Sequence, residues 1–249
     1  MTDGERLRAD RLLVEAGHFE SRARAQAAIA AGLVRADGAP VRRPSDLLAR
    51  SARIEAAPPH PYVSRGGLKL AAALDAFGID PAGLTCLDIG ASTGGFTDVL
   101  LRRGAARVHA VDVGRGQFHP GLAADPRVAL HEATDVRALD PGLLDGPPAL
   151  AVVDVSFISL AHVLPVLPAL TAPDARLVAL IKPQFEAGRA RVGRGGIVRD
   201  EAVRAEVCEE VRALARSLGF RPVGLIPSPV EGGDGNREFL LGAVREAAR

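Results

Sequence analysis

The sequence is poor in several residue types that often mark a functional site. Its 249 residues include no tryptophan, one tyrosine, one methionine and two cysteines. Cys86 and Cys208 give no metal-binding spacing, and a buried, inert thiol is the expected state of each. We therefore expect no bound metal.

Long apolar runs are also absent. Prolines interrupt "LAHVLPVLPALTAP" and "RLVALI" is short, so no window reaches the roughly 18 apolar residues of a membrane span. The first residues, "MTDGERLRAD", are charged, and no apolar run typical of a signal peptide follows them. These absences predict a cytoplasmic protein that does not bind a membrane, and we also expect a monomer.

Lysine is almost absent. The 31 basic residues include only two lysines, Lys69 and Lys182, and the others are arginines. Arginine supplies a permanent charge, whereas lysine can lose its proton in a protein and act as a base. The pattern indicates two positions where chemistry requires lysine, although chance survival in a sequence rich in Ala, Arg and Gly is the alternative.

The overall composition is that of an ordinary soluble domain. Apolar residues make up 47% and charged residues 24% of the chain. The net charge is +1, and residues 1–60 carry ten arginines against eight Asp and Glu. Bulk charge therefore does not indicate a nucleic-acid partner, and any such inference depends on where the arginines lie.

A proline-rich stretch, "PPHPYV" at residues 58–63, predicts a stiff linker between two domains. Residues 1–57 contain two helix-like segments, "RADRLLVEAGHF" and "SRARAQAAIAAG", and Ser21 is the expected N-cap of the second. A strand–turn–strand pattern, "LVRADGAPVRR", and a third short strand, "ARIEA", follow. We expect a small α+β binding domain at residues 1–57 and a larger domain at residues 64–249.

The N-terminal domain resembles the small RNA-binding domain first seen in ribosomal protein S-four. The resemblance covers about residues 5–57, and its most specific part is "ESRARAQAAIAAGLVRADG". It implies that Arg8, Arg22 and Arg24 contact RNA phosphates without reading base sequence. The alternative for these arginines is an ordinary solvated face.

Five apolar runs follow the linker: "LTCLDIG", "RVHAVDVG", "RVALHEATD", "LAVVDVS" and "RLVALIKP". Each precedes a polar or helical stretch, as is typical of a parallel sheet covered on both faces. Their polar ends are Asp88, Asp112, Asp135, Asp154 and Lys182. Because ligands bind beyond the carboxyl ends of such strands, we expect these side chains to meet at one edge of the sheet.

The last two strands are expected to form an antiparallel hairpin. "RPVGLIPS" and "REFLLGAV" flank the turn-rich segment "PVEGGDGN". Glu238 then begins the final strand at the edge where the parallel strands end. This arrangement predicts that Glu238 lies near Asp154 and Lys182.

The turn after the first parallel strand, "DIGASTGGFTDVL", indicates a nucleoside site. It lacks the G-x-G-x-x-G spacing of a dinucleotide site and the Gly-Lys-Ser/Thr of a P-loop. The Asp112 carboxylate can accept hydrogen bonds from both hydroxyls of a ribose, so a nucleoside without a pyrophosphate fits the site. We therefore predict S-adenosylmethionine as cofactor. A tight packing turn is the alternative for the glycines. The predicted cofactor-binding residues are Asp88, Gly90, Ala91, Ser92, Thr93, Gly94, Gly95, Phe96, Asp112, Val113 and Asp135.

Lys69, Asp154, Lys182 and Glu238 are the predicted catalytic residues. A ribose 2′-hydroxyl is a poor nucleophile that must lose its proton as it attacks a sulfonium methyl group, so the site needs a base and positive charge near the developing oxyanion. Two carboxylates would hold two lysines in place. Arginine cannot deprotonate in a protein, so Lys182→Arg is expected to keep cofactor binding and lose methyl transfer.

Five motifs together resemble the TlyA or hemolysin A family: "SRGGLKL", "DIGASTGGFTDVLL", "DVSFISL", "LIKPQFEAG" and "GNREFLL". The resemblance covers essentially the whole chain. It implies an α/β fold with a Rossmann-like class I methyltransferase sheet of the FtsJ type. It further implies an S-adenosylmethionine-dependent enzyme that methylates cytidine 2′-hydroxyls, with ribosomal RNA or ribosomal subunits as partners. The family's lysine, aspartate, lysine and glutamate correspond to Lys69, Asp154, Lys182 and Glu238.

Further RNA contacts are predicted near the same edge of the sheet. One arginine follows the linker, and others lie in the Gly/Arg-rich stretch "EAGRARVGRGGIVR". Phe157 or Phe185 could stack on a splayed base, and core packing is the alternative for both. The arginines concerned are Arg65, Arg189, Arg191 and Arg194.

Three other functions fit parts of the sequence. A membrane-lysing protein, suggested by the hemolysin label, would need a spanning segment or a strongly amphipathic surface helix, and neither is visible. A non-catalytic RNA chaperone would have the same domains with an incomplete site, whereas all four catalytic positions are filled. A pseudouridine synthase would carry a Gly-Arg-Leu-Asp motif, which the sequence lacks.

Overall fold

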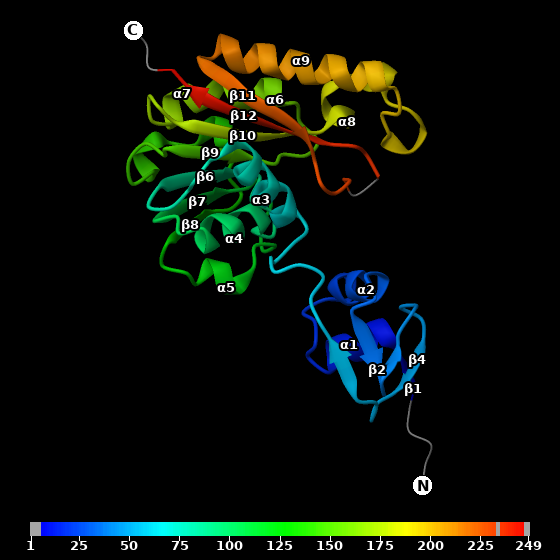
Figure 1. Cartoon of the computed structure of the whole chain (residues 1–249). Helices are drawn as coiled ribbons and strands as arrows, with labels where there is room; N and C mark the ends of the chain where they lie inside the picture. Colours follow the sequence, from blue (N-terminus) through cyan, green and yellow to red (C-terminus); the bar gives the residue numbers. More distant parts are fainter. Residues whose placement is uncertain (1–5, 233–234, 247–249) are drawn as a thin grey trace. The chain divides into compact units, whose positions relative to one another are not determined.

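The computed structural model describes residues 6–232 and 235–246. The chain forms two compact units, Met1–Pro61 and Tyr62–Arg249 (Figure 1). The division falls within the proline-rich stretch 58–63. Two residues of the turn predicted before the last strand lie outside the described residues.

The N-terminal unit contains two helices and two small antiparallel sheets. Its elements are β1 (Arg6–Arg8), α1 (Ala9–Glu15), α2 (Arg22–Ala30), β2 (Val34–Ala36), β3 (Ala39–Pro40), β4 (Leu47–Ala49) and β5 (Ile54–Ala56). Ser21 accepts a hydrogen bond from the backbone N–H of Arg24 and caps α2, as expected. The predicted hairpin and third strand form the sheet β3-β2-β5, whereas the β1–β4 pair was not predicted. The helices and strands of this unit pack around one hydrophobic core, which includes Leu13, Phe19 and Ile29.

The C-terminal unit is built on a seven-stranded sheet. Its strands are β6 (Thr85–Ile89), β7 (Arg107–Val111), β8 (Val128–His131), β9 (Leu150–Val153), β10 (Arg176–Ile181), β11 (Phe220–Pro227) and β12 (Phe239–Arg245). The order is β11-β12-β10-β9-β6-β7-β8, and β12 is antiparallel to both of its neighbours. Strands β6 to β10 are the five predicted parallel strands, and β11 and β12 form the predicted hairpin. The predicted α/β fold class is confirmed.

Helices cover both faces of this sheet. They are α3 (Gly66–Phe77), α4 (Gly95–Arg102), α5 (Pro120–Ala123), α6 (Leu160–Val163), α7 (Leu167–Leu170), α8 (Pro183–Glu186) and α9 (Glu201–Ser217), with 3-10 turns η1 (Val136–Ala138), η2 (Pro141–Leu143), η3 (Leu164–Val166), η4 (Arg189–Arg191) and η5 (Arg194–Gly196). Figure 1 shows α3 and α4 on one face and α9 on the other. On β6, Cys86 belongs to the core beneath α3 and α4, and Leu87 belongs to the core beneath α6 and α9. Burial on both faces explains why the strands read as near-continuous apolar runs.

Candidate active site

The ends of three neighbouring strands bring the predicted catalytic side chains together. Asp154 follows β9 and Lys182 follows β10, and these parallel strands are paired in the sheet. The first residue of β12 pairs with the last residue of β10, so the antiparallel strand brings Glu238 to the same edge. Lys69 reaches this edge from the first turn of α3.

Two ion pairs form at the edge, and the second is partly exposed through the Asp154 side chain. Lys69 Nζ lies 2.5 Å from Glu238 Oε2, and Lys182 Nζ lies 2.5 Å from Asp154 Oδ1. Lys182 Nζ also donates a 2.8 Å hydrogen bond to Ser156 Oγ. Each lysine is 9% exposed and Glu238 is 4% exposed. Pairing leaves the four groups without net charge, which offsets part of the cost of removing them from water.

The glycine turn between β6 and α4 packs against the protein itself. Gly90 has a φ of +81°, and a Cβ there would overlap the carbonyl oxygen of Asp154. A Cβ at Gly95 would overlap Ser64 Oγ. Glycine at these two positions allows β6 to approach the end of β9, and α4 to approach the segment before α3. The packing alternative that the sequence left open therefore applies to both positions.

A cavity of about 450 Å³ opens beside this turn, a volume usual for a small-molecule site. Asp112 lies on its wall. Asp112 Oδ2 accepts a 2.8 Å hydrogen bond from the Ser92 N–H, and Oδ1 accepts from the Gly114 N–H at 2.6 Å and from Gln117 Nε2 at 3.1 Å. A carboxylate has about four lone-pair sites, so a ligand that donates to Asp112 twice must displace one of these contacts. Apolar walls come from Val113, Val136, Phe157 and Ile158.

A second cavity, of about 230 Å³, contains the first lysine. Lys69, Arg65, Ala91, Thr93, Gly95 and Phe96 line it, and it shares Gly90, Ser92 and Asp154 with the first cavity. The two cavities therefore adjoin at Asp154. A third cavity, of about 660 Å³, lies against α9, β11 and β12; Glu238 lines it, but neither lysine does. We assign the site to the two adjoining cavities, because they hold the glycine turn and Lys69.

The other two predicted cofactor carboxylates, Asp88 and Asp135, also have protein partners. Asp88 lines neither adjoining cavity; it is fully buried, and its Oδ2 accepts a 2.6 Å hydrogen bond from Thr97 Oγ1 on α4. Burial raises the pKa of Asp88 to about 7, and the Thr97 hydrogen bond opposes that shift. Asp135 lines the larger of the two, but its Oδ2 lies 2.5 Å from Arg137 Nη2, which lowers the pKa of Asp135. The structure thus places Asp88 behind the turn and engages Asp135 with its neighbour.

The arginines predicted near the edge lie on the surface. Arg65 precedes α3 and lines the second cavity, and Arg189 and Arg194 are exposed. Arg191 Nη1 lies 2.8 Å from Glu206 Oε2, so α9 engages part of its guanidinium. RNA contact by these four arginines stays a prediction.

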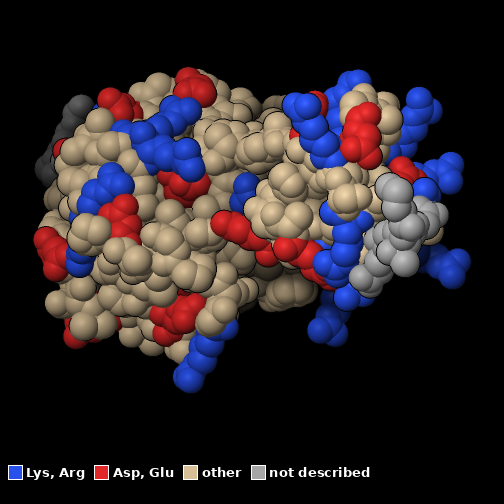
Figure 2. Space-filling model, turned by 90° about the horizontal axis from the view of Figure 1, so that it is seen from below, with Lys and Arg blue, Asp and Glu red and all other residues tan. Residues whose placement is uncertain are grey.

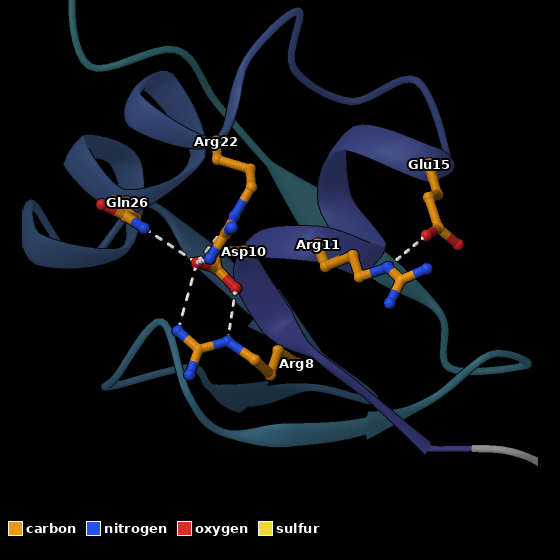
Figure 3. Close-up of polar contacts among 6 residues, drawn as sticks. All are labelled: Arg8, Asp10, Arg11, Glu15, Arg22 and Gln26. Atoms are coloured by element: carbon orange, nitrogen blue, oxygen red, sulfur yellow. Dashed lines mark hydrogen bonds and ion pairs between the residues drawn. The ribbon is translucent and has the colours of Figure 1, made fainter.

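Two of the three predicted arginines of the N-terminal unit point towards a buried acid. Arg8 and Arg22 meet the carboxylate of Asp10 (Figure 3). Arg24 Nη1 lies 3.9 Å from Glu20 Oε2. Basic side chains project from the face of this unit that Figure 2 shows. Their contact with RNA also stays a prediction.

Phe157 is not a core residue. Its side chain is 91% exposed, and its φ of +64° is rare for a bulky residue. Its ring centroid lies 5.2 Å from that of Phe185, with the planes tilted by 50°. The core-packing alternative is therefore excluded for Phe157.

Two side chains that hold the edge were not predicted from the sequence. Ser156 Oγ accepts a hydrogen bond from Lys182 Nζ. The sequence feature that could have indicated Ser156 is its position in the motif "DVSFISL". Asn236 is 1% exposed. Its Nδ2 donates a hydrogen bond of 2.9 Å to the carbonyl oxygen of Gly196, and its Oδ1 accepts one of 3.0 Å from the Val198 N–H. Asn236 thereby ties the Gly/Arg-rich stretch to the segment that precedes β12.

Residues 6–232 and 235–246 contain no group of three His, Cys, Asp or Glu side chains that could hold a metal ion. None of the helices formed by these residues is long and apolar enough to cross a membrane.

Comparison with known families identifies both units. Residues 62–245 match the FtsJ-like methyltransferases, and residues 7–54 match the S4 domain. The chain belongs to the FtsJ-like methyltransferase family. The expected Rossmann-like methyltransferase sheet and N-terminal S-four-type domain are therefore confirmed.

Relatives of this FtsJ-like methyltransferase carry two kinds of name. The chain is 47% identical over 238 residues to the "16S/23S rRNA (cytidine-2′-O)-methyltransferase TlyA" of Mycobacterium tuberculosis, covering 95% of this chain and 89% of that one. It is 39% identical over 235 residues to "Hemolysin A" of Brachyspira hyodysenteriae, covering 94% and 98%. A solved structure described as a hemolysin of Streptococcus thermophilus aligns with a TM-score of 0.77 at 41% identity, covering 98% and 90%. The resemblance to the TlyA or hemolysin A family is confirmed.

Proposed function

We propose that this FtsJ-like methyltransferase uses S-adenosylmethionine to methylate cytidine 2′-hydroxyls of ribosomal RNA, free or within ribosomal subunits. The observation that carries the proposal is the two lysine–carboxylate contacts, one of which includes Asp154 on the wall of a cavity of nucleoside size. The named activity of the Mycobacterium tuberculosis relative supports the substrate. We also propose that the enzyme acts in the cytoplasm as a monomer.

The residues of the larger adjoining cavity fit the cofactor. Its volume of about 450 Å³ suits an adenosine with a short side chain. Asp112 offers a carboxylate for the ribose, and Val113 and Ile158 offer apolar walls for the base. Bound there, the cofactor would supply a methyl group on a positively charged sulfur. Asp154 lies on the boundary with the second cavity, which Lys69 lines, and Asp154 pairs with Lys182.

The four catalytic side chains divide the work of the transfer. The bound cofactor would supply the methyl group as an electrophile, and the chain's own residues would orient the substrate 2′-hydroxyl and take up its proton. Lys182 must first lose a proton from the ammonium form that pairs with Asp154; it then accepts the proton of that hydroxyl, and Asp154 and Ser156 hold its Nζ in place. Lys69, paired with Glu238, supplies positive charge to the developing oxyanion.

Phe157 is suited to hold the base of the target nucleotide. It lies three residues after Asp154, lines the larger adjoining cavity and exposes nearly its whole ring. Bases splayed out of single-stranded RNA stack on such aromatic rings. The strained backbone at this residue supports a functional reason for the position.

Nucleoside mass spectrometry tests the proposal. Unmodified ribosomal subunits are incubated with labelled S-adenosylmethionine and either the wild-type protein or Lys182→Arg, and cofactor affinity is measured in parallel by calorimetry. We expect labelled 2′-O-methylcytidine with the wild type and none with the variant, at equal cofactor affinity. Label in no nucleoside with the wild type would contradict the proposed reaction, and near-wild-type turnover by Lys182→Arg would contradict the base role alone.

A further inference from the structure

Asp10 is a buried carboxylate that collects donors from two other segments (Figure 3). Its Oδ1 accepts from Arg8 Nε at 3.1 Å, and its Oδ2 accepts from Arg22 Nη2 and from Gln26 Nε2, each at 2.8 Å. Arg8 directly precedes α1, and the other two donors lie on α2. The side chain of Asp10 has no exposed surface. A hydrogen bond from Arg8, followed by those of Arg22 and Gln26, holds the pKa of Asp10 far below its usual range, so the carboxylate is ionised at neutral pH.

The cluster has more positive charge than the buried acid requires. One arginine would neutralise Asp10, yet two are present, which leaves the cluster with a net charge of +1. Each guanidinium uses Nε and Nη2 for Asp10. Among residues 6–232 and 235–246, the Nη1 groups of Arg8 and Arg22 donate to no protein acceptor, and the two side chains are 48% and 59% exposed. The described residues therefore leave part of each guanidinium available for a ligand, while its other edge is anchored.

We propose that Asp10 is a positioning residue that fixes Arg8 and Arg22 as a preformed pair for RNA backbone phosphates. The proposal rests on the proposed function, because it takes RNA as the partner of the N-terminal unit. Planar guanidinium groups bind phosphate oxygens through paired N–H groups. An anchored arginine loses less rotamer freedom on binding than a free one, and preorganisation of this kind raises affinity without adding a contact.

Asp10→Asn separates positioning from bulk electrostatics, because the two predict opposite signs. The substitution removes one negative charge from the unit, so charge alone would tighten RNA binding. If Asp10 positions the arginines, both side chains lose their anchor in Asp10→Asn. The affinity for RNA should then fall by about tenfold, which is the effect of freeing two long side chains. Glu55→Gln is the matched control: it makes the same charge change at an exposed residue whose Oε1 lies 3.8 Å from Arg53.

Arg22→Lys supplies a test that leaves Asp10 paired. The variant has the same net charge as the wild type, and Arg8 still neutralises the acid. A lysine ammonium has no second edge to present outward once it contacts Asp10, so we expect weaker RNA binding despite equal charge. Arg53→Lys, at a side chain that is 84% exposed and meets no buried acid, is the control and should bind as the wild type does.

The experiment measures binding of the full chain to unmodified ribosomal RNA by fluorescence anisotropy, at KCl concentrations from about 50 to about 200 mM. Thermal unfolding of each variant verifies that it is folded at the assay temperature. We expect Asp10→Asn and Arg22→Lys to bind RNA more weakly. The slope of the logarithm of the binding constant against the logarithm of the KCl concentration should be shallower by about one phosphate contact. RNA binding by Asp10→Asn that equals or exceeds that of the wild type would overturn the proposal. If Asp10→Asn does not fold, wild-type RNA binding by Arg22→Lys would overturn the proposal. Absence of binding by the wild type would instead contradict RNA as the partner.

Discussion

Gly90→Ala tests whether the glycine turn sets the position of Asp154. The added Cβ would overlap the Asp154 carbonyl oxygen, and it would also place alanine at a φ of +81°. The Cβ would lie 2.3 Å from that oxygen, so relief of the overlap requires a shift of about 1 Å between the ends of β6 and β9. A misplacement of that size in a catalytic group costs about 100-fold in rate.

Gly104→Ala is the matched control, because the same backbone strain occurs there without an overlap. Gly104 has a φ of +84°, and a Cβ there would lie 3.6 Å from the Cβ of Ala82, an ordinary contact. Placing an alanine in the left-handed backbone region lowers the free energy of unfolding by roughly 1–2 kcal/mol, and this loss is common to both variants. Overpacking adds about 1–3 kcal/mol for Gly90→Ala alone. The difference between the two variants therefore isolates the contact with β9.

Two measurements decide the outcome. Denaturant unfolding should rank the variants as wild type, Gly104→Ala and Gly90→Ala in decreasing stability. Single-turnover methyl transfer, at a temperature where all three are folded, should be near wild type for Gly104→Ala and about 100-fold slower for Gly90→Ala. Equal rates in the two variants would refute the idea that Gly90 sets the distance between β6 and Asp154.

Two further predictions concern pH and substrate binding. Burial is the main cause of the lowered pKa of His109 and His131, whose facing nitrogens are 3.3 Å apart. The unfolded chain, where histidine titrates near pH 6.5, therefore binds protons more readily than the fold, so stability should fall as pH drops below about 6.5. His131→Gln should reduce that loss, measured by thermal unfolding at pH 5.5 and pH 7.5. A loss independent of this substitution would assign the pH effect elsewhere. Phe157→Leu should raise the KM for RNA by about 5- to 100-fold, with Phe157→Tyr near wild type and cofactor affinity unchanged in both, because base stacking contributes about 1–3 kcal/mol. A change confined to cofactor affinity would show that Phe157 contacts the cofactor and not the substrate base.

The large sheet could be predicted because its strands are buried on both faces. Burial on both sides makes each strand a recognisable apolar run, and the alternation with polar stretches indicates parallel order. The prediction that a final hairpin returns Glu238 to the same edge depended only on antiparallel geometry, and it holds. The β1–β4 pair escaped prediction, because its strands are three residues each and show no period.

The site was harder to predict where side-chain direction matters. Asp88 is the fourth residue of β6, and alternation sends it to the α4 face, where Thr97 meets it, whereas Asp154 lies just beyond β9 and stays at the edge. The arginines of the N-terminal unit show the same limit. Sequence indicates a basic surface, but the pairing of Arg22 with Asp10 joins residues twelve positions apart through tertiary packing.

The two ion pairs of the active site also hold together parts of the fold that are distant in sequence. Lys69 and Glu238 join α3 to the segment before β12 across 169 positions, and Lys182 and Asp154 join the ends of β10 and β9. Removal of any one partner would leave an uncompensated buried charge, which costs stability as well as activity. Loss of turnover in an alanine variant at these positions therefore does not distinguish chemistry from structure. Lys182→Arg does distinguish them, because the charge that Asp154 requires remains while the ability to act as a base is lost.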